Sequence, residues 1–289
     1  MARELSESAK IERSIITKFR GGIWSKFLQA VKSYNLVEEG DRIAVCISGG
    51  KDSMLLAKCV QELKKRSDFP FDAEYIVMNP GYNRENSELI EYNLKKLDIP
   101  AKIFKSDIFE VNGIIGGEHP CYLCARMRRG FLYARAKELG CNKIALGHHK
   151  SDVIETTLMG MLFGGQIQGM MPKLRSNNFE GMELIRPLYC VLEDDIVHWQ
   201  KYNGLNFIAC ACSLTANLPQ GEQGKSARQD IKNLIKNFRE RNPDVDASIF
   251  KSLHNVQLDT LPEFKYKGET YSFNEKYAKG FRIEKNCED

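Results

Sequence analysis

The segment Ser-Gly-Gly-Lys-Asp-Ser at residues 48–53 places the tightest constraint on what this 289-residue chain can fold into. It follows a nearly continuous apolar run at 42–47, which is typical of a strand buried on both faces, and it precedes a helical pattern at 54–65. Two glycines let the backbone approach a ligand closely, and the first N–H groups of the following helix attract an anion. The segment therefore predicts a phosphate-binding turn between a strand and a helix.

The residues expected to contact the phosphates are Ser48, Gly49, Gly50, Lys51, Asp52 and Ser53. Lys51 would add a positive charge, and the two serines would add hydroxyl donors. The segment is not a Walker A loop, because the GxxxxGK[ST] pattern is absent. The alternative is an ordinary glycine-rich turn, which the position between a buried strand and a helix disfavours.

The rest of the chain alternates between short apolar runs and helical spacing. Runs typical of buried strands occur at 42–47, 73–78, 101–104 and 143–146, with a further strand or two expected at 183–188 and 206–209. Helical spacing occurs at 54–65, 87–97, 126–139, 152–163, 194–202, 228–241 and 247–255. This alternation predicts an α/β fold with a doubly wound parallel sheet.

Three regions follow from these patterns. Residues 1–40 have apolar positions at helical spacing, interrupted by two glycines, and predict a helical N-terminal extension. Residues 41–215 would form the sheet domain. Residues 216–289 would form a helical C-terminal extension and a tail, in which nothing after residue 261 predicts a regular element.

Composition and the N-terminal sequence indicate the cellular compartment that we expect for this protein. No uninterrupted apolar stretch reaches 18 residues, and the charged N-terminal segment has no apolar core, so neither a membrane span nor a secretory signal is expected. We therefore expect a cytoplasmic protein. Its net charge of +4 permits a nucleic-acid partner but is too small to indicate one. In a reducing compartment its nine cysteines are not expected to form structural disulfides.

Two close cysteine pairs, Cys121 with Cys124 and Cys210 with Cys212, indicate a metal, cluster or redox site. The first pair could bring two thiolates to one ion, and the second follows a predicted strand end. Zinc, an iron–sulfur cluster, a dithiol and buried thiols all remain open. Arginines surround the first pair and are candidates for phosphate contacts with RNA, namely Arg126, Arg128 and Arg129.

Further polar residues follow other predicted strands, at the edge where an open α/β sheet binds its ligands. Asn79 follows the second strand, and Gly147 and His148 follow the fourth. A structural role is favoured for His148 and its neighbour His149. Asp152 could cap the next helix, transfer a proton or bind Mg²⁺.

Together these features resemble the TtcA/TtuA family of tRNA-thiolating PP-loop enzymes. The shared motifs are SGGKDS, the Cys-x-x-Cys with its arginines, the stretch KIALGHH at 143–149, Gly164-Gly165, Pro172-Lys173-Leu174 and Ile185-Arg186-Pro187-Leu188. TtuA-type members carry a cysteine-rich N-terminal finger, whereas the first cysteine here is Cys46. The chain is therefore more similar to the TtcA branch, the tRNA 2-thiocytidine synthetases.

The resemblance implies a fold of the PP-loop ATP pyrophosphatase type, also called adenine nucleotide alpha hydrolase-like. It implies thiolation of cytidine 32 in the tRNA anticodon loop with ATP, Mg²⁺ and a 4Fe-4S cluster, through an adenylated base. A cysteine desulfurase or another sulfide source would supply the sulfur, and a homodimer is a family expectation.

The same resemblance assigns roles to individual residues. Lys51, Asp52 and Asp152 would be catalytic. Asn79, Gly147 and His148 would join the phosphate loop in binding the nucleotide. Cys121, Cys124 and either Cys210 or Cys212 would hold the cluster.

The sequence departs from the family pattern at one position, and two alternative functions stay open. Ser151 stands where the family has an aspartate, which leaves Asp152 as the candidate acid, base or metal ligand in that motif. A PP-loop enzyme that adenylates another tRNA base or a small amide acceptor would share the phosphate loop. A regulator that binds a nucleotide or a cluster without turnover would share both the loop and the cysteines.

Overall fold

The computed structural model describes residues 5–108, 120–208 and 227–278. The chain divides into two compact units, residues 1–237 and 238–289, and each is considered by itself. The boundary expected after residue 215 lies outside the described residues, so the three-part division stays a prediction. No helix in the described part of the chain is long and apolar enough to cross a membrane.

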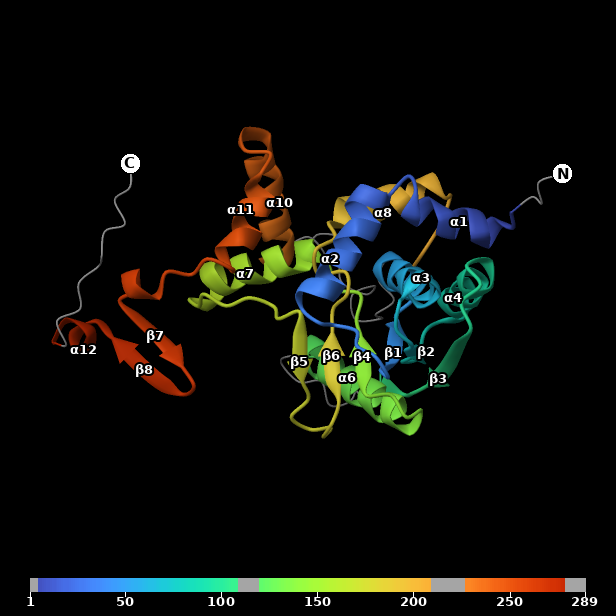
Figure 1. The fold of residues 1–289 in the computed structure, drawn as a ribbon, viewed down its shortest axis with the longest axis horizontal. Helices are drawn as coiled ribbons and strands as arrows, with labels where there is room; N and C mark the ends of the chain where they lie inside the picture. Colours follow the sequence, from blue (N-terminus) through green and yellow to red (C-terminus); the bar gives the residue numbers. More distant parts are fainter. Residues whose placement is uncertain (1–4, 109–119, 209–226, 279–289) are drawn as a thin grey trace. The chain divides into compact units, whose positions relative to one another are not determined.

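A six-stranded sheet in the order β3-β2-β1-β4-β6-β5 forms the centre of the first unit (Figure 1). The strands are β1 (Arg42–Ile47), β2 (Asp72–Asn79), β3 (Ala101–Lys105), β4 (Lys143–Ala145), β5 (Lys173–Arg175) and β6 (Glu183–Ile185). The pairs from β3 to β6 are parallel, whereas β5 runs antiparallel to β6. The predicted doubly wound parallel sheet is confirmed, apart from its antiparallel edge strand β5.

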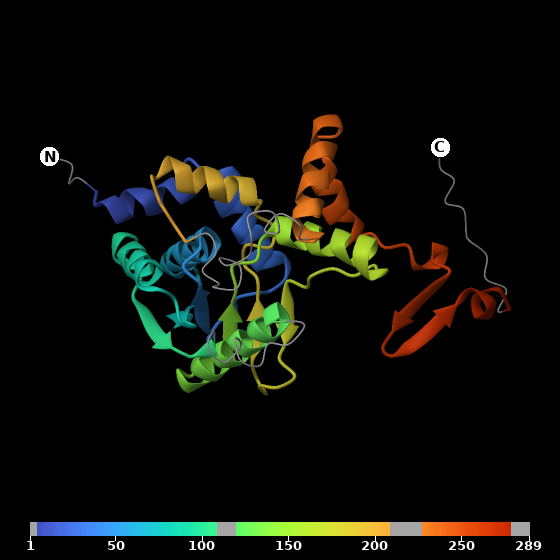
Figure 2. The ribbon, with the colours of Figure 1, turned by 180° about the vertical axis from the view of Figure 1, so that it is seen from behind.

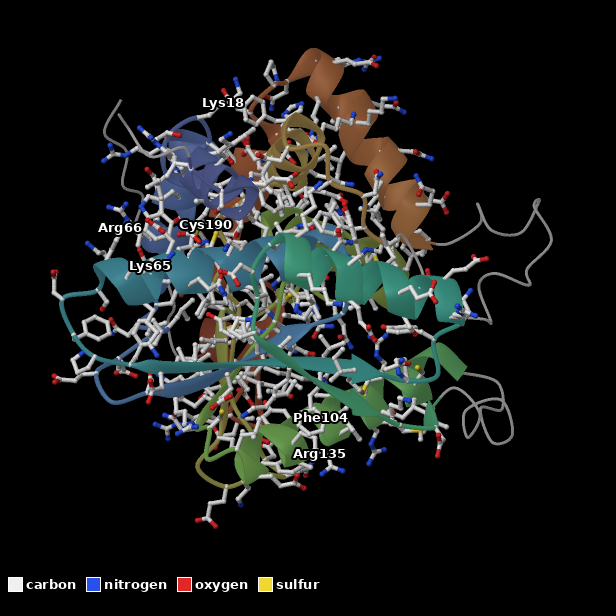
Figure 3. The ribbon with its side chains drawn as sticks, turned by 90° about the vertical axis from the view of Figure 1, so that its right-hand side faces the viewer. Lys18, Lys65, Arg66, Phe104, Arg135 and Cys190 are labelled. Atoms are coloured by element: carbon white, nitrogen blue, oxygen red, sulfur yellow. The ribbon has the colours of Figure 1, made fainter. Side chains whose placement is uncertain are left out.

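Helices cover both faces of this sheet, as parallel strands require crossover connections. Figure 3 shows α3 (Lys51–Arg66) and α4 (Arg84–Lys96) on one face and α6 (Pro120–Glu138) on the other. Arg135 holds α6 against the sheet, since its guanidinium lies 5.5 Å from the ring centre of Phe104 on β3. The central strand β1 is buried at every position from Ile43 to Ile47, as its apolar run predicts.

A further group of helices packs outside α3. The N-terminal helices are α1 (Glu7–Ile16) and α2 (Ser25–Ser33), and α8 (Glu193–Tyr202) lies beside them (Figures 1 and 2). The two glycines at 21 and 22 fall in a π-helical turn, Arg20–Trp24, which joins α1 to α2. The remaining helix between strands, α7 (Lys150–Gly164), follows β4.

Two expectations about strands were wrong. Of the strand expected at 206–209, the described residues 206–208 are not in a strand, and the carbonyl of Asn206 accepts a hydrogen bond from the side chain of Asn93, 2.7 Å away. Conversely, β5 forms where no strand was expected. Its three residues are too few for a periodic signal, and the pairing of Leu174 with Leu184 on β6 is a tertiary contact.

The order of the strands creates a switch point between β1 and β4. From β1 the chain winds outward to β2 and β3, and it then crosses to β4 on the other side of β1. Ala145, the last residue of β4, pairs with Val45, two residues before the end of β1, so the segments that follow the two strands diverge from one region. Ligands bind at such points in open α/β sheets.

The second unit contains a short hairpin among small helices. Its elements are α11 (Val245–Ser252), a 3-10 turn (Leu258–Thr260), β7 (Glu263–Tyr266), β8 (Glu269–Ser272) and α12 (Phe273–Ala278), and α10 (Ala227–Arg241) spans the boundary between the units. Lys267 and Gly268 have φ values of 52° and 86°, as a two-residue hairpin turn with two left-handed positions requires. This hairpin lies in the tail for which the sequence predicted nothing.

A buried lysine ties β4 to the start of the sheet domain. Lys143 is 2% exposed, and its Nζ lies 2.6 Å from Asp41 Oδ2 and 2.9 Å from Glu38 Oε2. Burial would lower the pKa of this amine, but hydrogen bonds to Asp41 and Glu38 outweigh burial and raise it. The lysine in the KIALGHH stretch is therefore a structural residue, at the end of β4 that is away from the switch point.

We predict that Lys143→Met destabilises the protein by about 3–5 kcal/mol, because Asp41 is left as a buried, uncompensated carboxylate. Urea denaturation followed by circular dichroism measures this change. Lys64→Ala is the matched control, since Lys64 pairs with Asp72 on the exposed surface and should matter little. Equal stability of the two variants would contradict the role given to Lys143.

Candidate nucleotide site and its cysteine helix

The segment 48–53 forms a turn that is braced by its own serines. Ser48 donates its backbone N–H to Ser53 Oγ at 3.1 Å, and Ser53 Oγ donates to the carbonyl of Gly50 at 2.9 Å. Gly50 is the N-cap of α3 and provides no side-chain cap. The first N–H groups of α3 therefore keep no side-chain partner at the cap, which is the arrangement that receives an anion.

Gly49 is required by both conformation and space. Its φ of +87° lies in the region that side chains disfavour. A Cβ at this position would lie 2.6 Å from Ile90 Cγ1 and 2.8 Å from Ile208 Cδ1. The predicted strand–turn–helix is confirmed, and its first glycine packs beneath neighbouring side chains.

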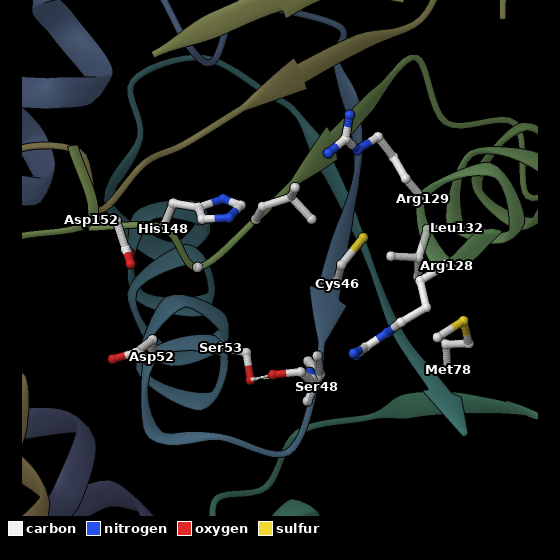
Figure 4. A pocket seen from close by; sticks show the side chains of 13 residues that line it. Cys46, Ser48, Asp52, Ser53, Met78, Arg128, Arg129, Leu132, His148 and Asp152 are labelled. Atoms are coloured by element: carbon white, nitrogen blue, oxygen red, sulfur yellow. Dashed lines mark hydrogen bonds between the residues drawn. The ribbon is translucent and has the colours of Figure 1, made fainter. Parts of the chain in front are cut away.

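A cavity of about 370 Å³ opens at the switch point beside this turn (Figure 4). One wall is the end of β1 and the start of α3, the second is the β4–α7 segment, and the third is α6. The lining residues are Cys46, Ile47, Ser48, Asp52, Ser53, Met78, Arg128, Arg129, Leu132, Leu146, Gly147, His148 and Asp152. This volume lies in the range of small-molecule sites.

Gly147 brings the β4–α7 segment into direct contact with α3. A Cβ on Gly147 would lie 3.0 Å from the backbone N of Ser53 and 3.1 Å from the carbonyl carbon of Asp52. The glycine therefore lets two loops meet, and it places His148 at the cavity. Gly147 lines the cavity, and the structure gives a packing reason for a glycine here, while its contact with a nucleotide remains a prediction.

His149 and Asp152 form a reciprocal cap at the start of α7. The His149 N–H donates to Asp152 Oδ2 at 2.9 Å, and the Asp152 N–H donates to His149 Nδ1 at 3.3 Å. Because Nδ1 accepts, the proton lies on Nε2, which is 3.7 Å from Asp52 Oδ1. The structural role favoured for His149 is supported, because its ring and backbone cap the start of α7.

Asp52 keeps one carboxylate oxygen available at the cavity. Its Oδ1 is buried and accepts no hydrogen bond from the described residues, although Lys51 Nζ lies 3.3 Å away. A buried carboxylate oxygen beside a phosphate-binding turn fits Mg²⁺, which prefers oxygen ligands. Of the carboxylates predicted for the site, Asp52 therefore fits a cation best.

His148 lines the cavity as a neutral ring. Burial, followed by the nearby charge of Arg186, lowers the pKa of His148 to about 4. Its Nδ1 is buried and has no hydrogen-bond partner within the part of the chain that the structure describes. The ring can thus exchange one hydrogen bond with a ligand at physiological pH.

Two residues near the cavity had no assigned role in the sequence reading. Glu193, at the start of α8, accepts a hydrogen bond from Lys51 Nζ at 2.9 Å, and its backbone N–H donates to Ser151 Oγ at 3.1 Å. Burial raises the pKa of Glu193, but hydrogen bonds from Lys232 and Lys51 outweigh burial and bring it to about 2. Arg186 is 8% exposed, and burial lowers the pKa of its guanidinium to about 10.

The helix α6 brings Arg128 and Arg129 to this site and places Cys124 beside Met78, one of its lining residues. Cys124 is 7% exposed and packs with Met78 and Ile108. Cys121 belongs to the same helix, three residues before Cys124. Arg128 and Arg129 extend from α6 into the cavity, opposite the phosphate loop (Figure 4), whereas Arg126 is exposed and is not part of its lining.

The full set of predicted cluster ligands cannot be placed. Cys210 and Cys212 lie outside the described residues, so the choice between them stays a prediction. In the described ranges, no group of three or more His, Cys, Asp and Glu side chains could hold a metal ion. The residue type fits, because thiolates are the usual ligands of iron–sulfur clusters and Cys124 lies in an apolar environment near the cavity.

Asn79 is occupied by the turn that follows β2. Its Oδ1 accepts from the N–H groups of Gly81 at 3.0 Å and Tyr82 at 2.7 Å, and its Nδ2 donates to Ser87 at 3.2 Å. Asn79 is not among the residues that line the cavity of about 370 Å³. The structure therefore shows a local role for Asn79, and its predicted contact with a nucleotide remains a prediction.

Comparisons with known proteins show the family of this chain. A family model described as a PP-loop domain matches residues 23–215. The chain is 34% identical over 267 residues to the tRNA-cytidine(32) 2-sulfurtransferase of Vibrio vulnificus (strain YJ016), covering 92% of this chain and 84% of that protein. This chain belongs to the PP-loop family of tRNA-cytidine(32) 2-sulfurtransferases.

A second family member gives the same result. The tRNA-cytidine(32) 2-sulfurtransferase of Geotalea uraniireducens (strain Rf4) is 36% identical over 265 residues, which cover 90% of this chain and 99% of that protein. Among solved structures, the U34-tRNA thiolase NcsA from Methanococcus maripaludis with its [4Fe-4S] cluster has a TM-score of 0.63 at 20% identity. That match covers 92% of this chain and 90% of NcsA, and it shows a shared fold. The family and fold inferred from the sequence are confirmed.

For this member of the 2-sulfurtransferase family, we predict that Gly147→Ala displaces the start of α3. The added methyl meets backbone atoms of Asp52 and Ser53 and should cost about 1–3 kcal/mol of stability. Affinity for ATP should fall as well, measured by isothermal titration calorimetry. Gly164→Ala, on α7, is the control, because its Cβ meets no atom within 4 Å. Unchanged ATP affinity in Gly147→Ala would contradict the close approach.

Proposed function

We propose that this chain uses ATP to thiolate C2 of a cytidine in tRNA, at position 32 as in the relatives named above. The observation that carries the proposal is the meeting of two elements at one cavity. The phosphate loop forms one wall, and the helix with the cysteine pair and its arginines forms another. A site for ATP alone does not require the second wall.

The loop would hold the phosphates of ATP. The N–H groups at the start of α3 and the hydroxyl of Ser48 would face the anion, and Lys51 would neutralise part of its charge. The hydroxyl of Ser53 would keep the turn in shape through its bond to the carbonyl of Gly50. Lys51 Nζ forms an ion pair with Glu193 Oε1 at 2.9 Å, and phosphate oxygens would replace that partner when ATP binds. Asp52 would hold Mg²⁺ through its buried oxygen, and His148 and Gly147 would border the nucleotide.

The helix α6 would meet the tRNA. Arg128 and Arg129 line the cavity and can contact either the nucleotide phosphates or the RNA backbone near the target base, while Arg126 is exposed for a more distant phosphate. A cytidine in the anticodon loop can be unstacked at low cost, and so can reach the cavity. The positive charge of these arginines would therefore attract both ATP and tRNA.

The reaction would take two balanced steps. The C2 oxygen of cytidine attacks the α-phosphorus of ATP, the bond from that phosphorus to the bridging oxygen breaks, and pyrophosphate leaves. A sulfide then attacks C2, and the C2–O bond breaks so that AMP leaves with the oxygen. Lys51 and the α3 N–H groups stabilise the charge that develops on the phosphates.

The cysteines would hold the sulfur chemistry next to the activated base. Cys121, Cys124 and one of Cys210 and Cys212 would bind a 4Fe-4S cluster, which supplies the sulfide for transfer when it is bound. Asp152 remains a candidate for proton transfer, although its two oxygens are engaged by the α7 cap and by Arg228. A cysteine desulfurase or other sulfide source, a homodimer and a cytoplasmic location remain predictions.

The decisive measurement is tRNA-dependent release of pyrophosphate together with mass analysis of the nucleosides. We predict that Lys51→Ala reduces pyrophosphate release by about 10²-fold or more, because the developing phosphate charge loses its cation. The control is Lys64→Ala, on the exposed end of α3. Pyrophosphate release without 2-thiocytidine would indicate a different acceptor, and no tRNA-dependent release would favour a regulator.

A separate experiment tests the proposed role of Cys124 on α6 as a cluster ligand. We predict that Cys124→Ser loses bound iron and thiolation after anaerobic reconstitution, while ATP still binds. Cys190→Ala is the control, because Cys190 lies on the opposite side of the sheet from α6 (Figure 3). Full iron content and thiolation in Cys124→Ser would remove Cys124 from the proposed ligand set.

A further inference from the structure

The first turns of α10, outside the matched PP-loop domain, contact acidic residues at and near the candidate nucleotide site. That match ends at residue 215, whereas α10 begins at Ala227. Arg228 and Lys232 lie one turn apart on this helix and face α7 and α8, within the first compact unit. Figures 1 and 2 both show the start of α10 beside α7.

Arg228 contacts two carboxylates of α7 at once. Its Nε donates to Glu155 Oε2 at 2.6 Å, and its Nη2 is paired with Asp152 Oδ1. Asp152 lines the cavity, and Glu155 is 3% exposed. The two acids are three residues apart on one helix face, where like charges repel each other. Arg228 offsets that repulsion and keeps Asp152 in place at the cavity.

A chain of alternating charges continues from this pair to the phosphate loop. Lys232 Nζ lies 2.9 Å from Glu193 Oε2 and 3.7 Å from Glu155 Oε1. The other oxygen of Glu193 accepts from Lys51. When phosphates engage Lys51, Glu193 keeps Lys232 as its partner. Of the two cations of α10, Arg228 lies nearer to Glu155 and also pairs with Asp152, so it contributes most to offsetting the charge of the α7 carboxylates beside a polyanion.

We propose that Arg228 is a positioning residue of the nucleotide site: it neutralises the paired carboxylates of Asp152 and Glu155 so that a polyphosphate can bind beside them. The inference rests on the proposed function, in which ATP is the nucleotide. Arg228 acts here through the carboxylates, with no contact to the nucleotide required. The trio of Arg228, Asp152 and Glu155 has a net charge of −1, which becomes −2 when the arginine is replaced by a neutral residue.

The test compares binding of ATP and of adenosine by isothermal titration calorimetry on the full chain. Arg228→Gln should raise the Kd for ATP by about tenfold or more, because the phosphates then meet uncompensated negative charge. The Kd for adenosine, which has no phosphates, should change little. Arg228→Lys keeps the charge and should recover most of the ATP affinity. The double variant Arg228→Gln/Glu155→Gln restores the net charge of −1 and should also recover affinity.

The matched control is Arg239→Gln. Arg239 lies three turns along α10 and forms two hydrogen bonds to Asp246, at 2.7 and 2.9 Å, so it reports the cost of removing a similar pair elsewhere. Its ATP affinity should equal that of the wild type. Thermal melting of every variant shows which are folded. If Arg228→Gln does not fold, the comparison of Arg228→Lys and the double variant with the wild type carries the test.

Three results would overturn the inference. Wild-type ATP affinity in folded Arg228→Gln would show that the neutralisation is not needed. Equal loss in the single and double variants would show that Arg228 acts on the nucleotide directly. Equal loss for adenosine and ATP would indicate general damage to the site. A wild-type chain that binds ATP without thiolating cytidine contradicts the proposed function alone, whereas one that does not bind ATP contradicts both.

Discussion

The close approach of Gly147 to the first turn of α3 is the contact on which the nucleotide site depends. The missing side chain lets the β4–α7 segment pack closely against the backbone of Asp52 and Ser53. A Cβ on Gly147 would be only 3.0 Å from Ser53 N. That contact joins the loops on the two sides of the switch point. It also places His148 and the α7 cap beside the phosphate loop, so that both border one cavity.

Electrostatic balance is the second constraint on this site. Asp52, Asp152, Glu155 and Glu193 gather where a polyanion is expected to bind, which would be unfavourable without cations among them. Lys51, Lys232 and Arg228 come from α3 and α10, and each is paired with at least one of those carboxylates. The phosphate loop is therefore one end of a wider charge network that includes a helix beyond the PP-loop match.

Family membership and local geometry explain different parts of the function. The relatives indicate the chemistry, and the structure shows why α6 is part of the site, since its arginines line the same cavity as the phosphate loop. Ser151 is a residue that family membership and local geometry explain together. It replaces an acid expected from the family, and its hydroxyl accepts the first N–H of α8, which holds Glu193 near Lys51.

Much of the fold could be predicted from the sequence because its signals are local. The apolar run of β1, the glycine pattern at 48–53 and the alternation of strands and helices depend on neighbours in the chain, and these were confirmed. The strand expected at 206–209 is absent from its described residues 206–208, and β5 and the β7–β8 hairpin were missed. In each case the deciding factor is a side-chain contact, an edge pairing or a short turn that leaves little periodic signal.

The sequence by itself determined the phosphate-binding turn, the class of sheet and the family, because short-range spacing is sufficient for each. Only the tertiary structure decided which charged residues belong to the site. Arg228 is 76 positions from Asp152 and Glu193 is 142 positions from Lys51. Such pairs form only when helices pack at the switch point, and no local pattern indicates which acid will meet which base.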